Sequence, residues 1–194
     1  ILKNKSKVIQ FSKNNNNVSV SPHVGGLTYD SELKAINRIL FKLVNRKMEI
    51  ENKFLKINKT VRYSTFGDLT SETKYFWILL HGSNMICEQM LYKFKDFNPK
   101  EHFIISPEGL SRFYKSGFNG DVVASWITKR DRLEEIKDVS AYLTKILNLY
   151  KKYLSKKCKI ILLGFSQGGT IAFRWLHSKN ININYFIPYS FWIP

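Results

Sequence analysis

Short runs of apolar residues recur along the chain from about residue 61 onwards. Residues 75–80 (YFWILL) are all apolar or aromatic, which is typical of a strand that is buried on both faces. Comparable runs predict strands over 61–66, 75–80, 102–106, 159–163 and 185–190. A Gly-Asp pair fits a turn after the first strand, and a proline ends the third.

Segments with helical periodicity lie between these runs. Residues 131–150 form a predicted helix whose apolar stripe comprises Leu133, Ile136, Val139, Leu143, Ile146, Leu147 and Tyr150. Residues 85–95 and 168–178 are also predicted to be helical. Several glycines and many aromatic residues indicate a loop over 109–126.

The first 57 residues have a different composition. Residues 1–17 are rich in Lys, Asn and Ser, which indicates an irregular segment, and they lack the apolar stretch of a signal peptide. Residues 30–50 have helical periodicity, with an apolar face that comprises Leu33, Ile36, Leu40, Leu43 and Val44. We predict an N-terminal extension over 1–57, irregular apart from this one helix, and a separate domain over 58–194.

Strands that alternate with helices predict an α/β fold. Because the strands are wholly apolar, we expect a doubly wound, mostly parallel sheet with helices on both faces. Active sites in such sheets lie at the carboxyl ends of the strands. That edge would bring together the segments 80–82, 106–107 and 163–164.

The chain of 194 residues carries a formal net charge of +16, from 31 Lys and Arg against 15 Asp and Glu. Such a charge suits binding to nucleic acid or to an anionic membrane surface. However, Lys outnumbers Arg 24 to 7 and there are 16 Asn, a pattern that an AT-rich genome produces without selection for binding. Since no nucleic-acid-binding motif accompanies the charge, we prefer composition bias and expect no nucleic-acid partner.

The cysteines and histidines give little sign of a special chemistry. Two cysteines, Cys87 and Cys158, are too few for a disulfide scaffold and fit a reducing compartment, so we expect a cytoplasmic protein. They and the four histidines lack the spacing of metal ligands, and we expect no metal and no cofactor. No apolar run reaches the ~18–20 residues of a membrane span. The sequence does not indicate an oligomeric state.

The segment 164–168 (GFSQG) carries the clearest chemical signal. It has the pattern G-x-S-x-G and stands between a predicted strand and a predicted helix, the context that a nucleophile elbow requires. In such an elbow the glycines let strand and helix approach each other, and the N-terminus of the helix directs positive potential at the serine. Ser166 is the candidate nucleophile, and the backbone N–H of Gln167 is a candidate oxyanion donor. The alternative is a glycine-rich turn with an incidental serine.

A second feature lies after the strand over 75–80, where His81 and Gly82 form a turn. In hydrolases with this elbow, a loop at that place supplies the second oxyanion N–H. Here the donor would be Ser83 or the adjoining backbone. We interpret His81 as structural, because the general base follows the nucleophile in the chain order of this fold.

At these residues the sequence resembles the α/β-hydrolase superfamily. It is most similar to the phospholipase/carboxylesterase family, which includes acyl-protein thioesterases and small bacterial esterases. The resemblance spans roughly 58–194, and its segments are RYSTFGDL (62–69), WILLHGSN (77–84), IISPEGLSRFY (104–114), ASWITKRDRLEEIKDVSAYL (124–143), ILLGFSQGGTIAFRWL (161–176) and PYSFWIP (188–194).

The resemblance implies Ser166 as nucleophile, with Gln167 and the region of Ser83 forming the oxyanion hole. It also implies that three aromatic residues lie near the acyl site: Trp126, Phe113 and Tyr114. The open alternative for these three is that they cover the core. The substrate would be a small acyl ester or thioester.

The chain departs from the family at the catalytic triad. In this fold an Asp or Glu and then a His follow the serine. Here the last acidic residue is Asp138, and the only later histidine is His177. His177 lies on the same predicted helix, about 16 Å from Ser166 at ~1.5 Å per residue, which is too far for a hydrogen bond. The family carries its Asp and His on later loops, so we expect a chain that lacks its C-terminal portion and is nearly inactive as it stands.

Residues 17–44 lie outside this resemblance and weakly resemble the C-terminal end of D-2-hydroxyacid dehydrogenases. There a Pro-His-Xaa-Gly stretch carries the acid/base histidine, and His23 would hold that place. No dinucleotide-binding loop accompanies it. The alternatives are a helical cap or a surface extension, in which His23 is an ordinary loop residue.

Three hypotheses of function are open at this point. The first is a serine hydrolase that acts on acyl esters or thioesters. The second is a non-catalytic remnant or binding module with the same fold. The third is a basic nucleic-acid binder, for which salt-dependent retention on DNA would be the evidence.

Overall fold

The structure is a computed structural model, and it describes residues 34, 50–179 and 181–193. The chain divides into two compact units, Ile1–Lys56 and Ile57–Pro194. Within the first unit, Lys34 is helical and exposed, and residues 50–56 are exposed coil. The irregular segment predicted over 1–17, His23 and nearly all of the helix predicted over 30–50 lie outside the described residues.

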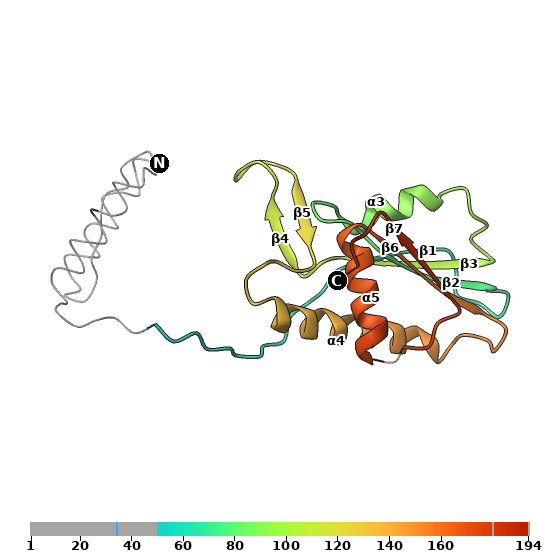
Figure 1. The fold of residues 1–194 in the computed structure, drawn as a ribbon. Helices are drawn as coiled ribbons and strands as arrows, with labels where there is room; N and C mark the ends of the chain where they lie inside the picture. Colours follow the sequence, from blue (N-terminus) through green and yellow to red (C-terminus); the bar gives the residue numbers. More distant parts are fainter. Residues whose placement is uncertain (1–33, 35–49, 180, 194) are drawn as a thin grey trace, which may run out of the picture. The chain divides into compact units, whose positions relative to one another are not determined.

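A five-stranded sheet forms the centre of the second unit, in the order β1-β3-β2-β6-β7 (Figure 1). Its strands are β1 (Tyr63–Phe66), β2 (Tyr75–Leu80), β3 (His102–Pro107), β6 (Lys159–Phe165) and β7 (Tyr185–Tyr189). All neighbouring strands pair in parallel except β1 with β3, which are antiparallel. The expected α/β fold with a mostly parallel sheet is therefore confirmed.

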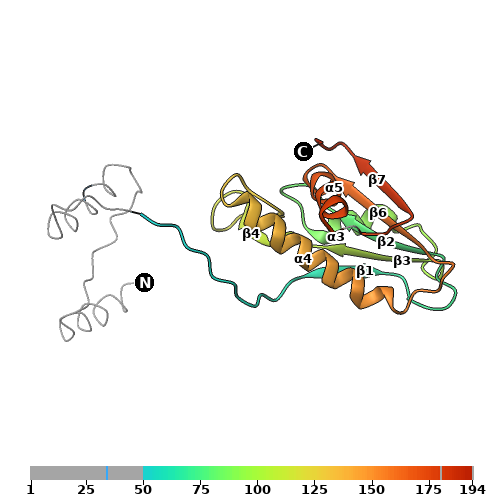
Figure 2. The ribbon, with the colours of Figure 1, turned by 60° about the horizontal axis from the view of Figure 1, so that its bottom comes forward.

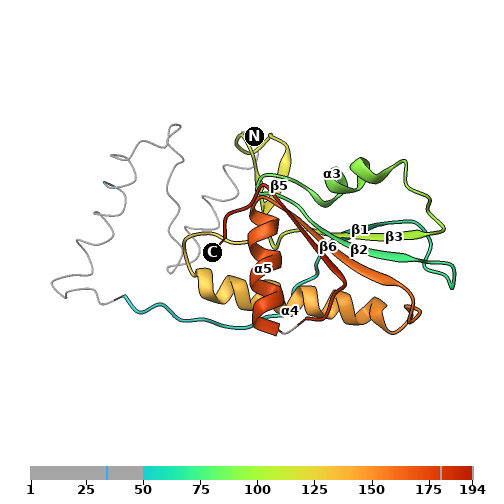
Figure 3. The ribbon, with the colours of Figure 1, turned by 45° about the vertical axis from the view of Figure 1, so that its right-hand side comes forward.

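Helices cover both faces of this sheet (Figures 1 and 3). On one face lie α3 (Cys87–Leu91) and the following short 3-10 helix η2 (Tyr92–Phe94). On the other face lie α4 (Arg132–Lys151) and α5 (Gln167–Lys179), which stand in front of the strands in Figure 2. Described helices are all too short or too polar to cross a membrane.

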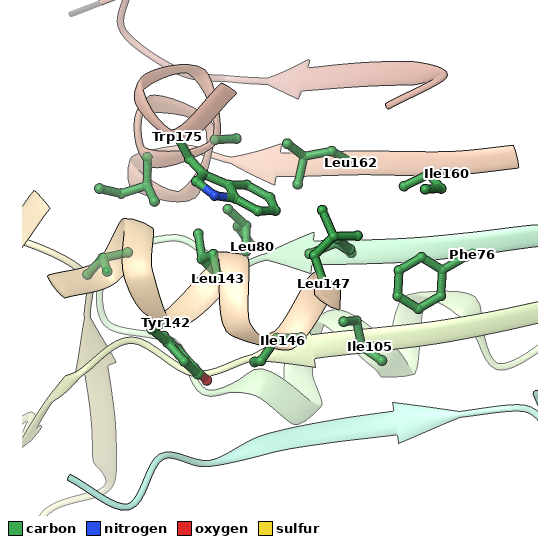
Figure 4. Close-up of a cluster of buried hydrophobic side chains, with 14 of the residues drawn as sticks. Phe76, Leu80, Ile105, Tyr142, Leu143, Ile146, Leu147, Ile160, Leu162 and Trp175 are labelled. Atoms are coloured by element: carbon green, nitrogen blue, oxygen red, sulfur yellow. The ribbon is translucent and has the colours of Figure 1, made fainter. Parts of the chain in front are cut away.

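The alternation of side chains along each strand divides the core in two. In β2, Phe76, Ile78 and Leu80 face α4 and α5, whereas Trp77 and Leu79 face α3. The larger cluster joins the sheet to Leu143 and its neighbours on α4 and to Trp175 on α5 (Figure 4). Both faces are thus apolar, which is why the strands appear in the sequence as unbroken apolar runs.

Two expectations from the sequence were wrong. The loop predicted over 109–126 contains a second, two-stranded antiparallel sheet, β4 (Ser111–Tyr114) with β5 (Val122–Ser125). Each strand has only four residues, too few for an alternating pattern to stand out. Leu133, placed on the apolar stripe of α4, is 72% exposed, because it lies in the first turn and the buried positions of this helix begin only at Val139.

Candidate active site

Ser166 occupies a strained junction between β6 and α5. Its φ of 51° lies in the left-handed region, which non-glycine residues rarely adopt and which costs about 1–3 kcal/mol. Its N–H donates to the carbonyl of Tyr189 on β7 (2.9 Å), and its own carbonyl accepts from the N–H of Gly169 (2.9 Å). The strand–turn–helix context predicted for the G-x-S-x-G segment is therefore present.

Close packing explains why glycines flank this junction. A methyl group on Gly164 would lie 2.6 Å from the Cα of Gly169. A methyl group on Gly168 would overlap the carbonyl oxygens of Leu80 and His81 at the end of β2. The first turn of α5 therefore rests directly on the backbone that leaves β2, and only glycine permits that approach.

The turn after β2 lies beside Ser166 because Leu80 pairs with Gly164 across the sheet. The chain continues from β2 towards β3 on one side and from β6 towards β7 on the other, so these two strand ends form the topological switch point of the sheet. Ser83, the predicted oxyanion residue, is exposed in this turn. The N–H of the next residue, Asn84, already donates to the carbonyl of Ala124 (3.0 Å).

His81 is fully buried, and both of its ring nitrogens are hydrogen-bonded. Nε2 accepts the N–H of Gly109 (2.9 Å), so Nδ1 carries the proton and donates it to the carbonyl of Gly82 (2.7 Å). Burial lowers the pKa of His81, against the opposing effect of the Gly82 carbonyl. A neutral imidazole with both nitrogens engaged cannot take a proton from Ser166, and it holds two loops together instead.

This buried histidine predicts a loss of stability in mild acid. Its pKa is lowered in the folded chain, whereas in the unfolded chain it is about 6.5. The stabilisation is therefore present above pH ~6.5 and is lost as the pH falls, by up to about 1.4 kcal/mol per pH unit, because only the unfolded chain takes up the proton. Urea unfolding between pH 7.5 and 5.5 measures it. The control is His177→Gln, which removes an exposed histidine instead of the buried one. A free energy of unfolding that does not change over this pH range would contradict the prediction.

The side chain of Gln167 makes three hydrogen bonds to three successive residues. Its Oε1 accepts the N–H of Trp126 (2.9 Å) and the hydroxyl of Ser125 (3.0 Å), and its Nε2 donates to the carbonyl of Ile127 (2.8 Å). Ser125 is the last residue of β5, and Trp126 and Ile127 follow it directly. Sequence reasoning singled out only the backbone of Gln167, because nothing local in the sequence shows that residues 40 positions apart meet.

The three aromatic residues predicted near the acyl site have two different environments. Trp126 is 1% exposed, belongs to the larger core cluster and donates from Nε1 to the carbonyl of His81 (2.7 Å). Phe113 and Tyr114, on β4, are 42% and 49% exposed. The structure thus gives Trp126 a packing role and leaves the two β4 residues with free surface.

The other described histidines lie away from Ser166. His102 begins β3, at the edge of the sheet opposite to the carboxyl ends of the strands, and it pairs there with Tyr75. His177 is exposed near the end of α5. Over the described residues, then, no imidazole other than the engaged His81 stands at the carboxyl edge where Ser166 lies.

A polar cluster that the sequence did not predict lies between α3 and β3. The side-chain atoms of Cys87, Glu88 and Glu108 that could bind a metal ion, one sulfur and two carboxylate oxygens, lie within 4.8 Å of one another. Arg62 pairs with Glu88 and Arg112 pairs with Glu108, at 2.6 Å each. Burial works to raise the pKa of Glu88, but hydrogen bonds from Arg62 and Cys87 outweigh it and lower that pKa to about 2. Each of the two carboxylates is thus paired with a guanidinium group.

Known proteins resemble this chain in fold and not in sequence. No protein-family model and no curated protein sequence matches it. Among solved structures, a phospholipase/carboxylesterase from Dyadobacter fermentans is similar, with 16% identity and a TM-score of 0.51, over 70% of this chain and 62% of that one. So is a protein of unknown function from Agrobacterium tumefaciens, with 17% identity and a TM-score of 0.51, over 68% and 61%.

These likenesses show an α/β-hydrolase fold. The chain spans about three-fifths of the length of the two solved proteins, 62% and 61%. At 16% and 17% identity the comparison concerns the fold alone. A function for this chain has to be inferred from its own site.

Proposed function

We propose that this chain is a serine hydrolase of acyl esters or thioesters with Ser166 as its nucleophile. The observation that carries the proposal is the left-handed backbone of Ser166 at the switch point of the sheet. Strain of this kind persists where the surroundings hold it in place, and it is concentrated at functional sites. Here the glycines beside the junction and the hydrogen bond to Tyr189 hold it.

The rest of the proposed mechanism uses neighbouring backbone groups. Ser166 Oγ would attack the acyl carbonyl, and the N–H of Gln167 at the start of α5 would stabilise the oxyanion. A second donor would come from Ser83, since the N–H of Asn84 is already bonded to Ala124. Phe113 and Tyr114 would contact the acyl chain with their exposed surface. Water would then release the acid.

A non-catalytic module is the second candidate function. The observation in its favour is the environment of the described histidines, which offer Ser166 no base. An unactivated serine hydroxyl is a weak nucleophile. The two functions differ in whether Ser166 reacts with an acylating or phosphonylating reagent.

Reaction with a fluorophosphonate separates these functions. We expect one adduct per chain, at Ser166, after prolonged incubation, and we expect Ser166→Ala to abolish it because the nucleophilic oxygen is gone. Intact-mass and peptide mass spectrometry measure both. Ser178→Ala, which removes an exposed hydroxyl on the same helix, is the matched control and should react normally. An adduct at other serines, or none, would contradict the hydrolase proposal.

A further inference from the structure

The side-chain amide of Gln167 joins parts of the site that are distant in the sequence. It follows Ser166 directly, and its three hydrogen bonds reach residues 125–127, at the end of the β4–β5 hairpin. Those residues also contact the turn after β2, because Trp126 donates to the carbonyl of His81 (2.7 Å). One segment therefore bonds to both strand ends that flank the switch point.

Ala124, the residue of β5 directly before this segment, strengthens the connection. Ala124 accepts the N–H of Asn84 (3.0 Å) and donates to the carbonyl of Met85 (2.9 Å), so that β5 is paired with the turn after β2. Gly109, just before the hairpin, donates to His81 in the same turn. The hairpin thus holds the turn after β2 in place, and Gln167 holds the hairpin against α5.

We propose that Gln167 is a positioning residue. Its side chain clamps segment 125–127 and thereby fixes the backbone N–H groups around Ser166, both at the start of α5 and in the turn after β2. The proposal rests on the proposed function, whose oxyanion donors it concerns. Glutamine suits this place because one side chain must accept two hydrogen bonds and donate one. An ionised glutamate keeps the acceptor and loses the donor to Ile127, and a methionine of similar length loses both.

Two substitutions in the full chain test the clamp by hydrogen exchange of the peptide over residues 122–130. Gln167→Glu should raise exchange there, relative to the unsubstituted chain, at about pH 8, where a carboxylate oxygen would face the carbonyl of Ile127. At about pH 4.5 protonation restores a donor, so that the difference should shrink. Gln167→Met should raise exchange at both pH values. Exchange that is unchanged in both variants would overturn the clamp. An increase in Gln167→Glu that is equally large at both pH values would overturn it too.

The rate of fluorophosphonate reaction at Ser166 tests the positioning. Both variants should react roughly 10- to 100-fold more slowly at pH 8, as expected for small displacements of oriented groups. Reaction at the unsubstituted rate, despite raised exchange, would overturn positioning. If Ser166 of the unsubstituted chain does not react at all while the exchange results hold, the hydrolase proposal fails and the clamp stands. The urea midpoint of each variant identifies global unfolding, which would raise exchange over the whole chain.

Discussion

Hydrolysis of p-nitrophenyl butyrate by this chain is expected to be on the order of 10⁴- to 10⁶-fold slower than by a serine esterase with a complete triad, the usual cost of losing a triad member. Ser166, the proposed nucleophile, has a left-handed backbone and lies directly before the N-terminus of α5. The described residues do not provide Ser166 with an imidazole that could act as a base. Both ring nitrogens of His81 are hydrogen-bonded, and His102 lies at the opposite edge of the sheet.

Initial rates for the unsubstituted chain and for Ser166→Ala measure this directly. Any part of the remaining rate that passes through an acyl-enzyme should be lost in Ser166→Ala, because the attacking oxygen is gone. Added imidazole should raise the Ser166-dependent part of the rate, since it supplies a base from solution. A rate comparable with that of a complete esterase, lost in Ser166→Ala, would contradict the expectation.

Trp175→Ala is expected to lower the free energy of unfolding by about 3–5 kcal/mol. Trp175 is fully buried on α5 and packs in the larger core cluster, where Figure 4 shows it among side chains of β6 and α4. Its Nε1 also donates to the hydroxyl of Thr144 on α4 (2.9 Å). The truncation would remove the side chain that joins α5 to α4 and leave a cavity between them.

Trp192→Ala provides the matched control for this loss. It is the same chemical change at a position that is 87% exposed, and it should alter stability by less than about 0.5 kcal/mol. Urea unfolding followed by circular dichroism gives both values, provided that the slope m is the same in each variant. Equal midpoints for the two variants would show that Trp175 contributes nothing beyond what an exposed tryptophan does.

The strands of the main sheet could be predicted because burial on both faces leaves an unmistakable pattern. The run over 75–80 coincides with β2, and 102–106 and 185–190 differ from β3 and β7 by one residue at one end. The two strands of the β4–β5 hairpin could not be predicted. Phe113 and Tyr114 are both half exposed although they are neighbours on β4, so the strand shows no alternation of buried and exposed positions.

Local sequence also explains which parts of the site could be anticipated. The elbow at Ser166 is encoded by neighbouring residues, so its strand–turn–helix context was predictable. The contacts of Gln167 with residues 125–127, and the meeting of Cys87 with Glu108, depend on how the chain folds back and leave no local signature. The roles of Ser166, Gln167 and Ser83 stay predictions until the reactions above are measured.

The pairing of Leu80 with Gly164 also bears on how the molecule folds. The two residues are neighbours across the sheet but lie 84 positions apart in the chain. Closing a loop of that length costs entropy before any contact repays it, and contacts of such long range slow folding. Neither Ser166 nor the turn after β2 has its partner until that closure occurs. We therefore expect the candidate site to form late in folding, after the pairing of β2 with β3, which are closer together in the chain.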